Sequence, residues 1–277
     1  MSDQQRPVGL DGQVALVTGA GRGIGRAIAL ALGDAGAAVA VCARSDDVTQ
    51  VAKEVAKARG SAVAVRCDLT HRQEVEDMAA TVEAALGPVD LLVNNAAQPG
   101  PIGPLAETEP DEWWRTLEVN LRGTLYCTRA VLPGMLSRGH GRIVNVCSEA
   151  GFEAWPMLSA YVVSKAALYR LSENIAAETR GQGVAVFAIS PGFVRTEMTE
   201  HGLTCGDPGV EQQYADWFAN HEDVPAQMSA NLVVYLASGA ADVLSGRNID
   251  VSDDVAQMVA RAAEIQENDL YVMRQRA

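Results

Sequence analysis

The sequence predicts a single domain built on a doubly wound parallel β-sheet, an α/β fold with helices on both faces. Short runs rich in Val, Ile and Ala alternate with longer amphipathic stretches, which indicates repeated β-α units. The composition is that of a globular protein, with 48% hydrophobic and 21% charged residues among 277. Nothing between residues 10 and 250 has the composition of an interdomain linker, so one domain accounts for this region.

Six apolar runs are predicted to be strands buried on both faces, because each is bounded by Gly, Pro or charged residues. In order they are VALVT (14–18), AVAVCA (38–43), AVAVRC (62–67), VDLLVNN (89–95), RIVNVC (142–147) and VAVFAIS (184–190). Amphipathic patterns between them predict helices near residues 23–35, 47–59, 71–86, 111–136 and 158–180.

Two later parts of the chain depart from this rhythm. Residues 191–225 begin with Pro191-Gly192 and have no strong period, so we expect a long loop. It follows the carboxyl end of a strand, where open parallel sheets bind ligands, and is predicted to border the substrate. Residues 253–277 are predicted to form a helical extension of a catalytic domain, residues 1–252. We expect this extension to pack either on its own domain or on a neighbouring subunit.

Charge and residue usage exclude several classes of function. The net charge is −13, whereas nucleic acids and anionic membranes call for basic patches, so neither is an expected partner. No apolar run reaches the roughly 18 residues of a membrane span, and residues 1–13 lack the apolar stretch of a secretory signal. Five Cys without a CxxC pair suit a reducing compartment, and four scattered His show no metal-ligand spacing. We therefore expect a cytoplasmic protein without a metal site.

Tyr161 and Lys165, with Ser148 thirteen residues before the tyrosine, are the strongest candidates for chemistry. Positions i and i+4 of a helix share one face, so both side chains can reach the same small volume. An ammonium beside a phenol favours the phenolate, and we expect the pair to exchange a proton near neutral pH. Only three Lys occur in the chain, which makes this spacing suggestive.

A glycine-rich segment, TGAGRGIG (18–25), follows the first predicted strand and precedes a helix. Its G-x-x-x-G-x-G spacing differs from the G-x-G-x-x-G fingerprint of common dinucleotide domains. Glycines let the backbone approach a pyrophosphate, and a helix N-terminus presents unpaired N–H groups to it. The segment is therefore predicted to bind the phosphates of a dinucleotide.

The end of the second predicted strand, CARS (42–45), bears on the choice of dinucleotide. A carboxylate there would bind the ribose hydroxyls of NAD, whereas an Arg accommodates the 2′-phosphate of NADP. No carboxylate precedes Arg44, and Arg22 adds a second cation near the same corner. Asp46 and Asp47 follow directly and weaken the preference. NADP(H) is favoured, with NAD(H) as the alternative.

Together these residues resemble the short-chain dehydrogenase/reductase family over roughly residues 10–250. The glycine loop matches the family's T-G-x-x-x-G-x-G, and Tyr161 with Lys165 matches its Y-x-x-x-K. The family's N-N-A-G is matched by residues 94–96, but Ala97 stands in place of its glycine. Each match is weak evidence alone, and the resemblance to the family rests on all of them occurring in the family's order and at its spacing.

The resemblance implies a Rossmann-type fold and assigns a role to each matching residue. Tyr161 would be the general acid for ketone reduction, and Ser148 would stabilise charge on the substrate oxygen. Lys165 would hold the nicotinamide ribose, and Asn120 would position a water that links Lys165 to solvent. The implied cofactor-binding residues are Gly19, Arg22, Gly23, Ile24, Gly25, Arg44, Asp68, Leu69, Asn94, Ala96, Tyr161, Lys165, Pro191, Gly192, Val194 and Thr196.

Aromatic residues concentrate in the segments expected to border the substrate. Phe152, Trp155, Phe193 and Trp217 are predicted to line its pocket, which favours a bulky, apolar carbonyl or secondary alcohol. The expected function is an NAD(P)-dependent oxidoreductase with a small-molecule substrate, in a homodimer or homotetramer as the resemblance implies. The alternatives are an imine or enoyl reductase of the same fold, a non-catalytic NADP(H)-sensing protein, and a structural subunit of a larger assembly.

Overall fold

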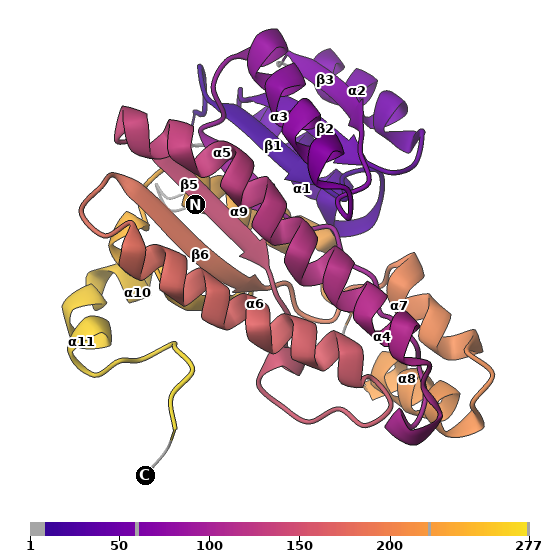
Figure 1. Ribbon diagram of the computed structural model, residues 1–277. Coiled ribbons are helices and arrows are strands. Elements are labelled where there is room, and N and C mark those ends of the chain that lie inside the picture. The colour runs from indigo at the N-terminus through magenta and orange to yellow at the C-terminus, as the bar shows by residue number, and fades with distance from the viewer. Residues whose placement is uncertain (1–8, 59–60, 221–222, 276–277) are drawn as a thin grey trace.

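The computed structural model describes residues 9–58, 61–220 and 223–275, and in this part of the chain a seven-stranded parallel sheet forms the centre (Figure 1). Small pieces of the predicted ranges 1–252, 191–225 and 253–277 lie outside the described residues. The strand order is β3-β2-β1-β4-β5-β6-β7. The strands are β1 (Val14–Thr18), β2 (Ala38–Ala43), β3 (Ala62–Arg66), β4 (Leu91–Asn94), β5 (Gly141–Val146), β6 (Val184–Ser190) and β7 (Asn248–Asp250). The predicted doubly wound sheet is confirmed, and its order reverses between β1 and β4.

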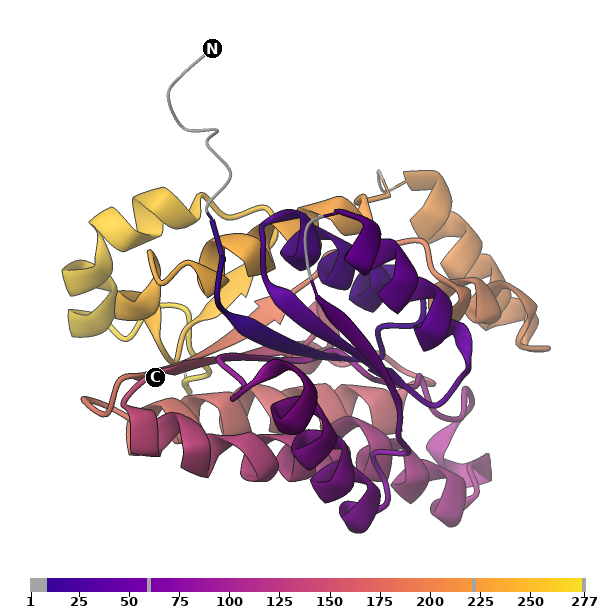
Figure 2. The same ribbon diagram turned by 90° about the horizontal axis from the view of Figure 1, so that it is seen from above.

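Helices cover both faces of this sheet, which lies between two helical layers in Figure 2. Alternate strand residues point to opposite layers: Val17 and Val41 join the core beneath α1 and α9, whereas Leu16 and Cys42 join the core beneath α3 and α5. The first layer contains α1 (Gly23–Asp34), α2 (Asp47–Ala58) and α9 (Ala226–Ala237), and the second contains α3 (Arg72–Leu86), α5 (Thr124–Arg138) and α6 (Ser159–Glu178). Both faces of the sheet are therefore buried, as the apolar runs predict.

The helix predicted over residues 111–136 is interrupted. It consists of α4 (Pro110–Leu117), a π-helical turn, η2 (Glu118–Gly123), and then α5. Such π turns within helices are frequent at functional sites, and this one contains Asn120. Other connections contain the 3-10 turns η1 (Leu105–Glu107), η3 (Glu149–Gly151) and η5 (Asp242–Leu244).

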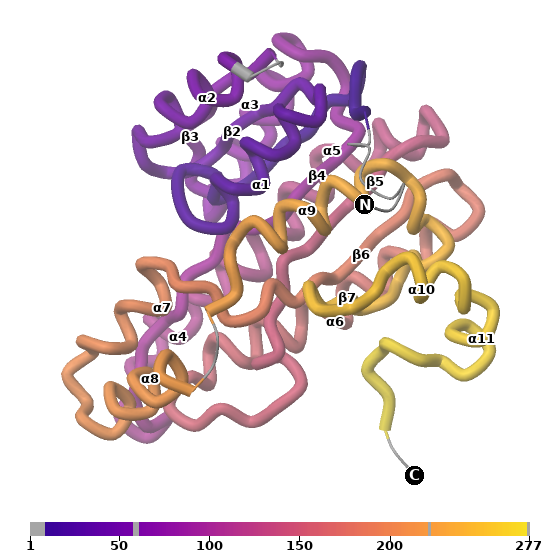
Figure 3. Tube along the Cα trace, turned by 180° about the vertical axis from the view of Figure 1, so that it is seen from behind, coloured from indigo at the N-terminus to yellow at the C-terminus, as the bar shows by residue number. Residues whose placement is uncertain are grey.

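The prediction of a long loop over residues 191–225 is wrong. The segment forms α7 (Glu197–His201), a 3-10 turn η4 (Gly202–Thr204) and α8 (Pro208–Asn220). Local capping explains the helices: Thr199 N–H donates to Thr196 Oγ1 at 3.3 Å, and Asp207 Oδ1 accepts from the first turn of α8. These helices lie beyond the carboxyl ends of the strands, beside α4 (Figure 3).

The C-terminal extension packs on its own domain as α10 (Val255–Ala260) and α11 (Ala262–Glu267). Met258 and Ile265 are buried in the core cluster that α9 also joins. The chain then runs along the open edge of β7, where Asn248 N–H donates to Tyr271 O at 2.8 Å. Strand β7 has one fully buried residue, Ile249, and so gives little apolar signal in the sequence.

Candidate active site

Two adjoining cavities lie at the carboxyl ends of the strands. The larger cavity has a volume of about 1160 Å³ and is bordered by the glycine loop, the ends of β2 and β3, and α7. The smaller cavity has a volume of about 120 Å³ and lies between the end of β6, η3 and α8. Six residues line both cavities and thus mark where they meet: Ile24, Pro99, Tyr161, Pro191, Thr196 and Met198.

The glycine loop has the close packing and backbone conformation that glycine allows. Gly19 and Gly23 have φ of 63° and 55°, and a Cβ on Gly19 would lie 2.7 Å from Ala96 Cα. Both glycines line the larger cavity, together with Gly21 and Arg22 at the start of the 12-residue helix α1. A backbone cradle at a helix N-terminus fits the diphosphate of a dinucleotide. Gly25 packs beneath the loop instead, since its Cβ would lie 2.4 Å from Gly19 O.

The structure corrects the position of Asn94. Its side chain is buried and donates to Asn145 Oδ1 at 2.8 Å and to Thr128 at 3.3 Å, away from the larger cavity. Asn95 and Ala96 line that cavity instead, and Asn95 Nδ2 donates to Thr18 O at 3.0 Å. Because successive residues at a strand end point to opposite faces, only one side chain of an Asn-Asn pair can face the cleft.

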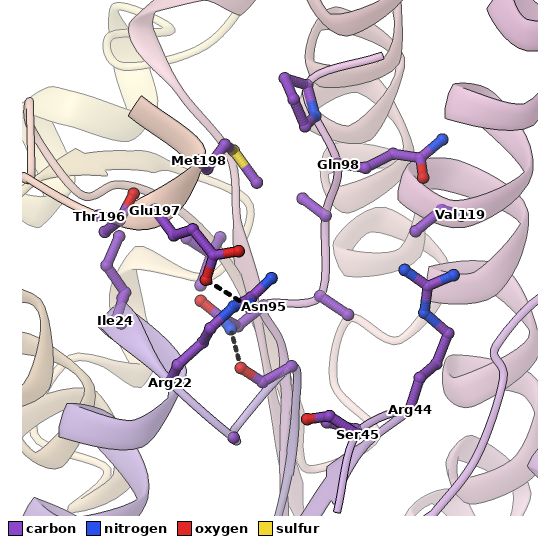
Figure 4. Close-up of a pocket in the computed structure, with 18 of the residues that line it drawn as sticks. Arg22, Ile24, Arg44, Ser45, Asn95, Gln98, Val119, Thr196, Glu197 and Met198 are labelled. Atoms are coloured by element: carbon purple, nitrogen blue, oxygen red, sulfur yellow. Dashed lines mark hydrogen bonds and ion pairs between the residues drawn. The ribbon is translucent and has the colours of Figure 1, made fainter. Parts of the chain in front are cut away.

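Arg44 and Ser45 line the larger cavity at the end of β2, and Asp68 and Leu69 line it after β3. In Figure 4, Arg22 points to Glu197 of α7, with which it forms an ion pair, and Arg44 reaches in from another wall. Arg22 lines the same cavity as Arg44, but its guanidinium is turned toward Glu197 in this structure, and its contribution to the choice of dinucleotide stays a prediction.

The two carboxylates that follow Arg44 are both engaged with neighbours. Asp46 pairs with Arg66 at 3.1 Å, and Asp47 Oδ2 accepts from Ser45 Oγ at 2.9 Å. Neither carboxylate lines the larger cavity. The cavity wall at this corner therefore presents Arg44 without either of the two carboxylates that follow it in the sequence.

Ser148, Tyr161 and Lys165 are divided between the two cavities. Helix α6 carries Tyr161 and Lys165 one turn apart, and Ser148 follows β5 at the start of η3. Lys165 lines only the larger cavity, Ser148 lines only the smaller one, and Tyr161 lines both. The phenol therefore stands at the boundary, with a hydroxyl on one side and an ammonium on the other.

Burial is the largest influence on the pKa values of Tyr161 and Lys165. It raises the pKa of Tyr161 to about 12, and a hydrogen bond with Ser148 opposes the rise. Burial also lowers the pKa of Lys165 to about 8. Lys165 Nζ donates to Val146 O at 2.8 Å and lies 5.5 Å from the centre of the Tyr161 ring. In the protein alone, burial keeps the pKa of the phenol high, and the expectation that Lys165 favours the phenolate stays a prediction.

Asn120 binds protein groups with its whole side chain. Its Oδ1 accepts from Gln98 N at 2.8 Å, and its Nδ2 donates to Gln98 O at 3.0 Å and Ser164 Oγ at 2.9 Å. Asn120 lines neither cavity. It ties the stretch after β4 to α6, next to Lys165, and so fixes the wall of the larger cavity.

An aromatic wall encloses the smaller cavity. Trp155, Phe193 and Trp217, which the sequence assigns to the substrate pocket, line this cavity, and the rings of Trp155 and Trp217 have centroids 5.0 Å apart. Gly192 and Val194 line this cavity rather than the larger one. Tyr214 also lines it and was missed, although it lies one turn before Trp217 on α8.

The structure corrects the position of Phe152. Its side chain is 49% exposed and lies outside both cavities. The ring packs on Tyr169 of α6, with centroids 4.3 Å apart. Proximity to Ser148 in the sequence was misleading, because the chain turns at η3 and the ring of residue 152 lies against Tyr169 of α6 and not in the smaller cavity.

Within the described residues, no group of three or more His, Cys, Asp or Glu is placed to hold a metal ion. No helix of the described chain is long and apolar enough to span a membrane. All five cysteines are free, and four of them are buried.

The chain is similar in sequence and in fold to known proteins. A family model described as short chain dehydrogenase matches residues 13–203. The short chain dehydrogenase pigC of Monascus ruber is 35% identical over 271 residues, which cover 94% of this chain and 85% of that protein. A variant of actinorhodin polyketide ketoreductase, solved with NADPH, is 34% identical with a TM-score of 0.80, covering 88% of this chain and 97% of that one. A 7α-hydroxysteroid dehydrogenase complexed with NADH and 7-oxo glycochenodeoxycholic acid is 33% identical with a TM-score of 0.80. The match covers 89% of this chain and 95% of that one.

Proposed function

The chain belongs to the short-chain dehydrogenase/reductase family, and we propose that it transfers a hydride between NADPH and a bulky, apolar ketone or the corresponding secondary alcohol. The observation that carries this proposal is the position of Tyr161 between the two cavities, with Lys165 on one side and Ser148 on the other. A reaction between a cofactor and a substrate in adjoining spaces needs a proton donor at their boundary.

In the reducing direction, Tyr161 donates its proton to the substrate oxygen in the smaller cavity. With its pKa raised to about 12 by burial, the phenol is protonated at neutral pH and has a proton to donate. Ser148 donates a hydrogen bond to the same oxygen and stabilises the charge that develops there. The bound nicotinamide would supply the hydride from the larger cavity.

Lys165 would hold the nicotinamide ribose by donating hydrogen bonds to its hydroxyls. Its ammonium has three donors and at present uses one on Val146 O. Its charge also stabilises the tyrosinate that remains after proton transfer. Asn120 acts as a positioning residue in this proposal, since it fixes Gln98 and α6 on both sides of the site.

Glycines 19 and 23 and the N-terminus of α1 would hold the diphosphate, and Asp68 and Leu69 would contact the adenine. Pro191 and Thr196, which border both cavities, would hold the carboxamide end of the cofactor. Arg44 and Ser45 would bind the 2′-phosphate, which supports NADP(H) over NAD(H). The solved relatives quoted above contain NADPH in one case and NADH in the other, so the family admits both.

Replacing Arg44 with alanine is expected to weaken NADPH binding by about 10- to 100-fold and to leave NADH binding unchanged. A hydrogen bond to a charged group contributes about 1.5–3 kcal/mol, and only NADPH has the phosphate to accept it. Calorimetric titration of both cofactors measures the effect. Arg26→Ala is the matched control, because Arg26 pairs with Glu54 on the surface of α1, outside the larger cavity. Equal affinities for both cofactors in all three proteins would contradict the assignment.

Replacing Trp217 with alanine is expected to raise the KM for an aromatic ketone about 10-fold, because the smaller cavity loses one of its aromatic walls. Phe152→Ala removes a smaller aromatic ring outside the cavity and is expected to change the KM by less than about twofold. Steady-state kinetics at saturating NADPH compare the two variants. If Phe152→Ala raises the KM as much as Trp217→Ala, the cavity is not the substrate pocket.

An imine or enoyl reductase of the same fold is the nearest alternative, and identification of the product separates it from a ketone reductase. A protein that only senses NADP(H) has no need for a proton donor between two cavities.

We further propose a cytoplasmic location, which five free cysteines suit, and assembly as a homodimer or homotetramer. In this proposal residues 1–252 are the catalytic domain and residues 253–277 an extension that covers the edge of β7.

A further inference from the structure

Ser190 ends strand β6 with a buried hydroxyl that points to no protein partner. The residue is 6% exposed, and its Oγ has no hydrogen-bond partner among the described residues. Ser190 lines the smaller cavity together with Ser148 and Tyr161. Ala188, two residues earlier and hence on the same face of the strand, packs with Cys147 and Tyr169, so Ser190 lies on the α6 side of the sheet.

Other buried serines in this half of the molecule are satisfied. Ser164 and Ser172 donate to backbone oxygens within α6, and Ser229 donates to Pro191 O at 3.4 Å. Leaving a buried hydroxyl without a partner costs about 1–3 kcal/mol, a cost that alanine would avoid at this position. An unpartnered hydroxyl on a cavity wall is thus available to whatever fills the cavity.

The hydroxyl lies close to the proposed reaction centre. Strands β5 and β6 are neighbours, and Cys147 N–H donates to Ile189 O at 2.8 Å, one residue before both Ser148 and Ser190. Adjacent strands are about 4.8 Å apart, so side chains at their ends can reach atoms of one ligand that are only a few bonds apart.

We infer that Ser190 determines specificity by hydrogen bonding a second oxygen of the substrate, on the carbon next to the reacting carbonyl. The preferred substrates are then α-oxygenated ketones with a bulky, apolar remainder that fits the aromatic wall. This inference rests on the proposed function for the position of the reacting carbonyl.

Asp250 is the competing partner for Ser190 within the protein. The two residues are aligned in the β6–β7 register, and Asp250 Oδ2 is likewise buried with no hydrogen-bond partner in the described part of the chain. A hydrogen bond between them would make Ser190 a structural residue that does not discriminate between substrates. The two residues are not hydrogen bonded in the structure, although they are neighbours.

Two ketones of the same shape provide the test, namely 2-hydroxyacetophenone and propiophenone, in which a hydroxyl is exchanged for a methyl. The wild type is expected to have the higher kcat/KM for 2-hydroxyacetophenone, and Ser190→Ala is expected to lower this preference about 10-fold. Ser190→Thr, which keeps a hydroxyl, is expected to keep part of the preference for 2-hydroxyacetophenone. Ser229→Ala is the control, because it removes a buried serine that is already satisfied and lies outside the smaller cavity.

Equal losses for both ketones in Ser190→Ala, or an unchanged ratio, would overturn the inference and favour the Asp250 pairing. Binding is measured separately by quenching of the Trp155 and Trp217 fluorescence, since both rings line the cavity. If the wild type binds but reduces neither ketone, the reductase proposal fails for these compounds, and the binding ratio still decides the role of Ser190. Absence of binding at millimolar concentrations would also contradict the inference.

Discussion

Tyr161→Phe is expected to lower kcat by about 10²- to 10⁴-fold, the range that general acid catalysis contributes, while NADPH binding is retained. The substitution removes one oxygen from the boundary between the two cavities and leaves the ring that lines both. Because Lys165 and the glycine loop are untouched, the dissociation constant for NADPH is expected to change by less than about threefold. Single-turnover reduction and a fluorescence titration of NADPH measure the two quantities separately.

Tyr214→Phe is the matched control for this experiment. Tyr214 also presents a phenol to the smaller cavity, and burial raises its pKa to about 12, as it does for Tyr161. Tyr214 has no ammonium one turn away and does not line the larger cavity. The variant Tyr214→Phe is therefore expected to lose far less turnover than Tyr161→Phe. Comparable losses in both variants would show that general polarity of the cavity matters rather than a positioned acid.

Lys165→Met is expected to lower kcat by at least about 10²-fold and also to raise the KM for NADPH, in contrast to Tyr161→Phe. Lys165 is the ammonium that faces the larger cavity beside Tyr161, so its loss removes both ribose binding and support for the tyrosinate. Initial rates over a range of NADPH concentrations separate the two effects. A variant with normal KM and normal kcat would contradict the assigned role.

The same substitution is expected to stabilise the protein without cofactor at neutral pH. The pKa of Lys165 is about 8 in the folded protein, against 10.5 as the ordinary value. Between these pH values the unfolded chain binds a proton that the folded chain does not, so stability rises with pH through this window. Below about pH 8 the full cost of burying the charge is present, on the order of 3 kcal/mol at 1.36 kcal/mol per pKa unit. The unpaired Val146 O offsets part of this gain.

Urea unfolding at pH 7 and pH 10.5 tests this expectation. The wild type should gain stability from this group between the two pH values, and Lys165→Met should not. Lys53→Met, at an exposed position of α2, controls for general effects of removing a charge. If Lys165→Met is less stable than the wild type at pH 7, the buried ammonium stabilises the fold instead of burdening it.

The sequence predicted the strands of the sheet and the common helical face of Tyr161 and Lys165, because both depend on short-range patterns. Continuous apolar runs mark strands that are buried on both faces, and six strands lie where these runs occur. The spacing of Tyr161 and Lys165 determines their common face on α6, whatever the rest of the fold does.

The sequence could not determine features that depend on the path of the chain around the site. Phe152 is close to Ser148 in the sequence, yet after η3 its ring lies against Tyr169 and outside the smaller cavity. Arg22 pairs with Glu197, which lies far along the chain on α7. The pKa of Tyr161 depends on how completely the site is desolvated, and a pair of residues in a sequence carries no such information.

Ser190 and Tyr214 were not predicted as site residues for different reasons. Ser190 ends an apolar strand pattern and has no distinguishing signal, because its importance comes from the missing partner of its hydroxyl. Tyr214 could have been found, since Tyr214, Trp217 and Phe218 follow an i, i+3, i+4 pattern on one helical face.

The most direct test of the central claim is NADPH consumption by the wild type with a panel of aromatic and alicyclic ketones, with Tyr161→Phe as the blank. We predict turnover of at least one bulky ketone to its alcohol, and loss of that turnover in Tyr161→Phe while NADPH still binds. NADPH binding without consumption across the panel, or equal consumption by the wild type and Tyr161→Phe, would contradict the account of Tyr161 as the proton donor of a ketone reductase.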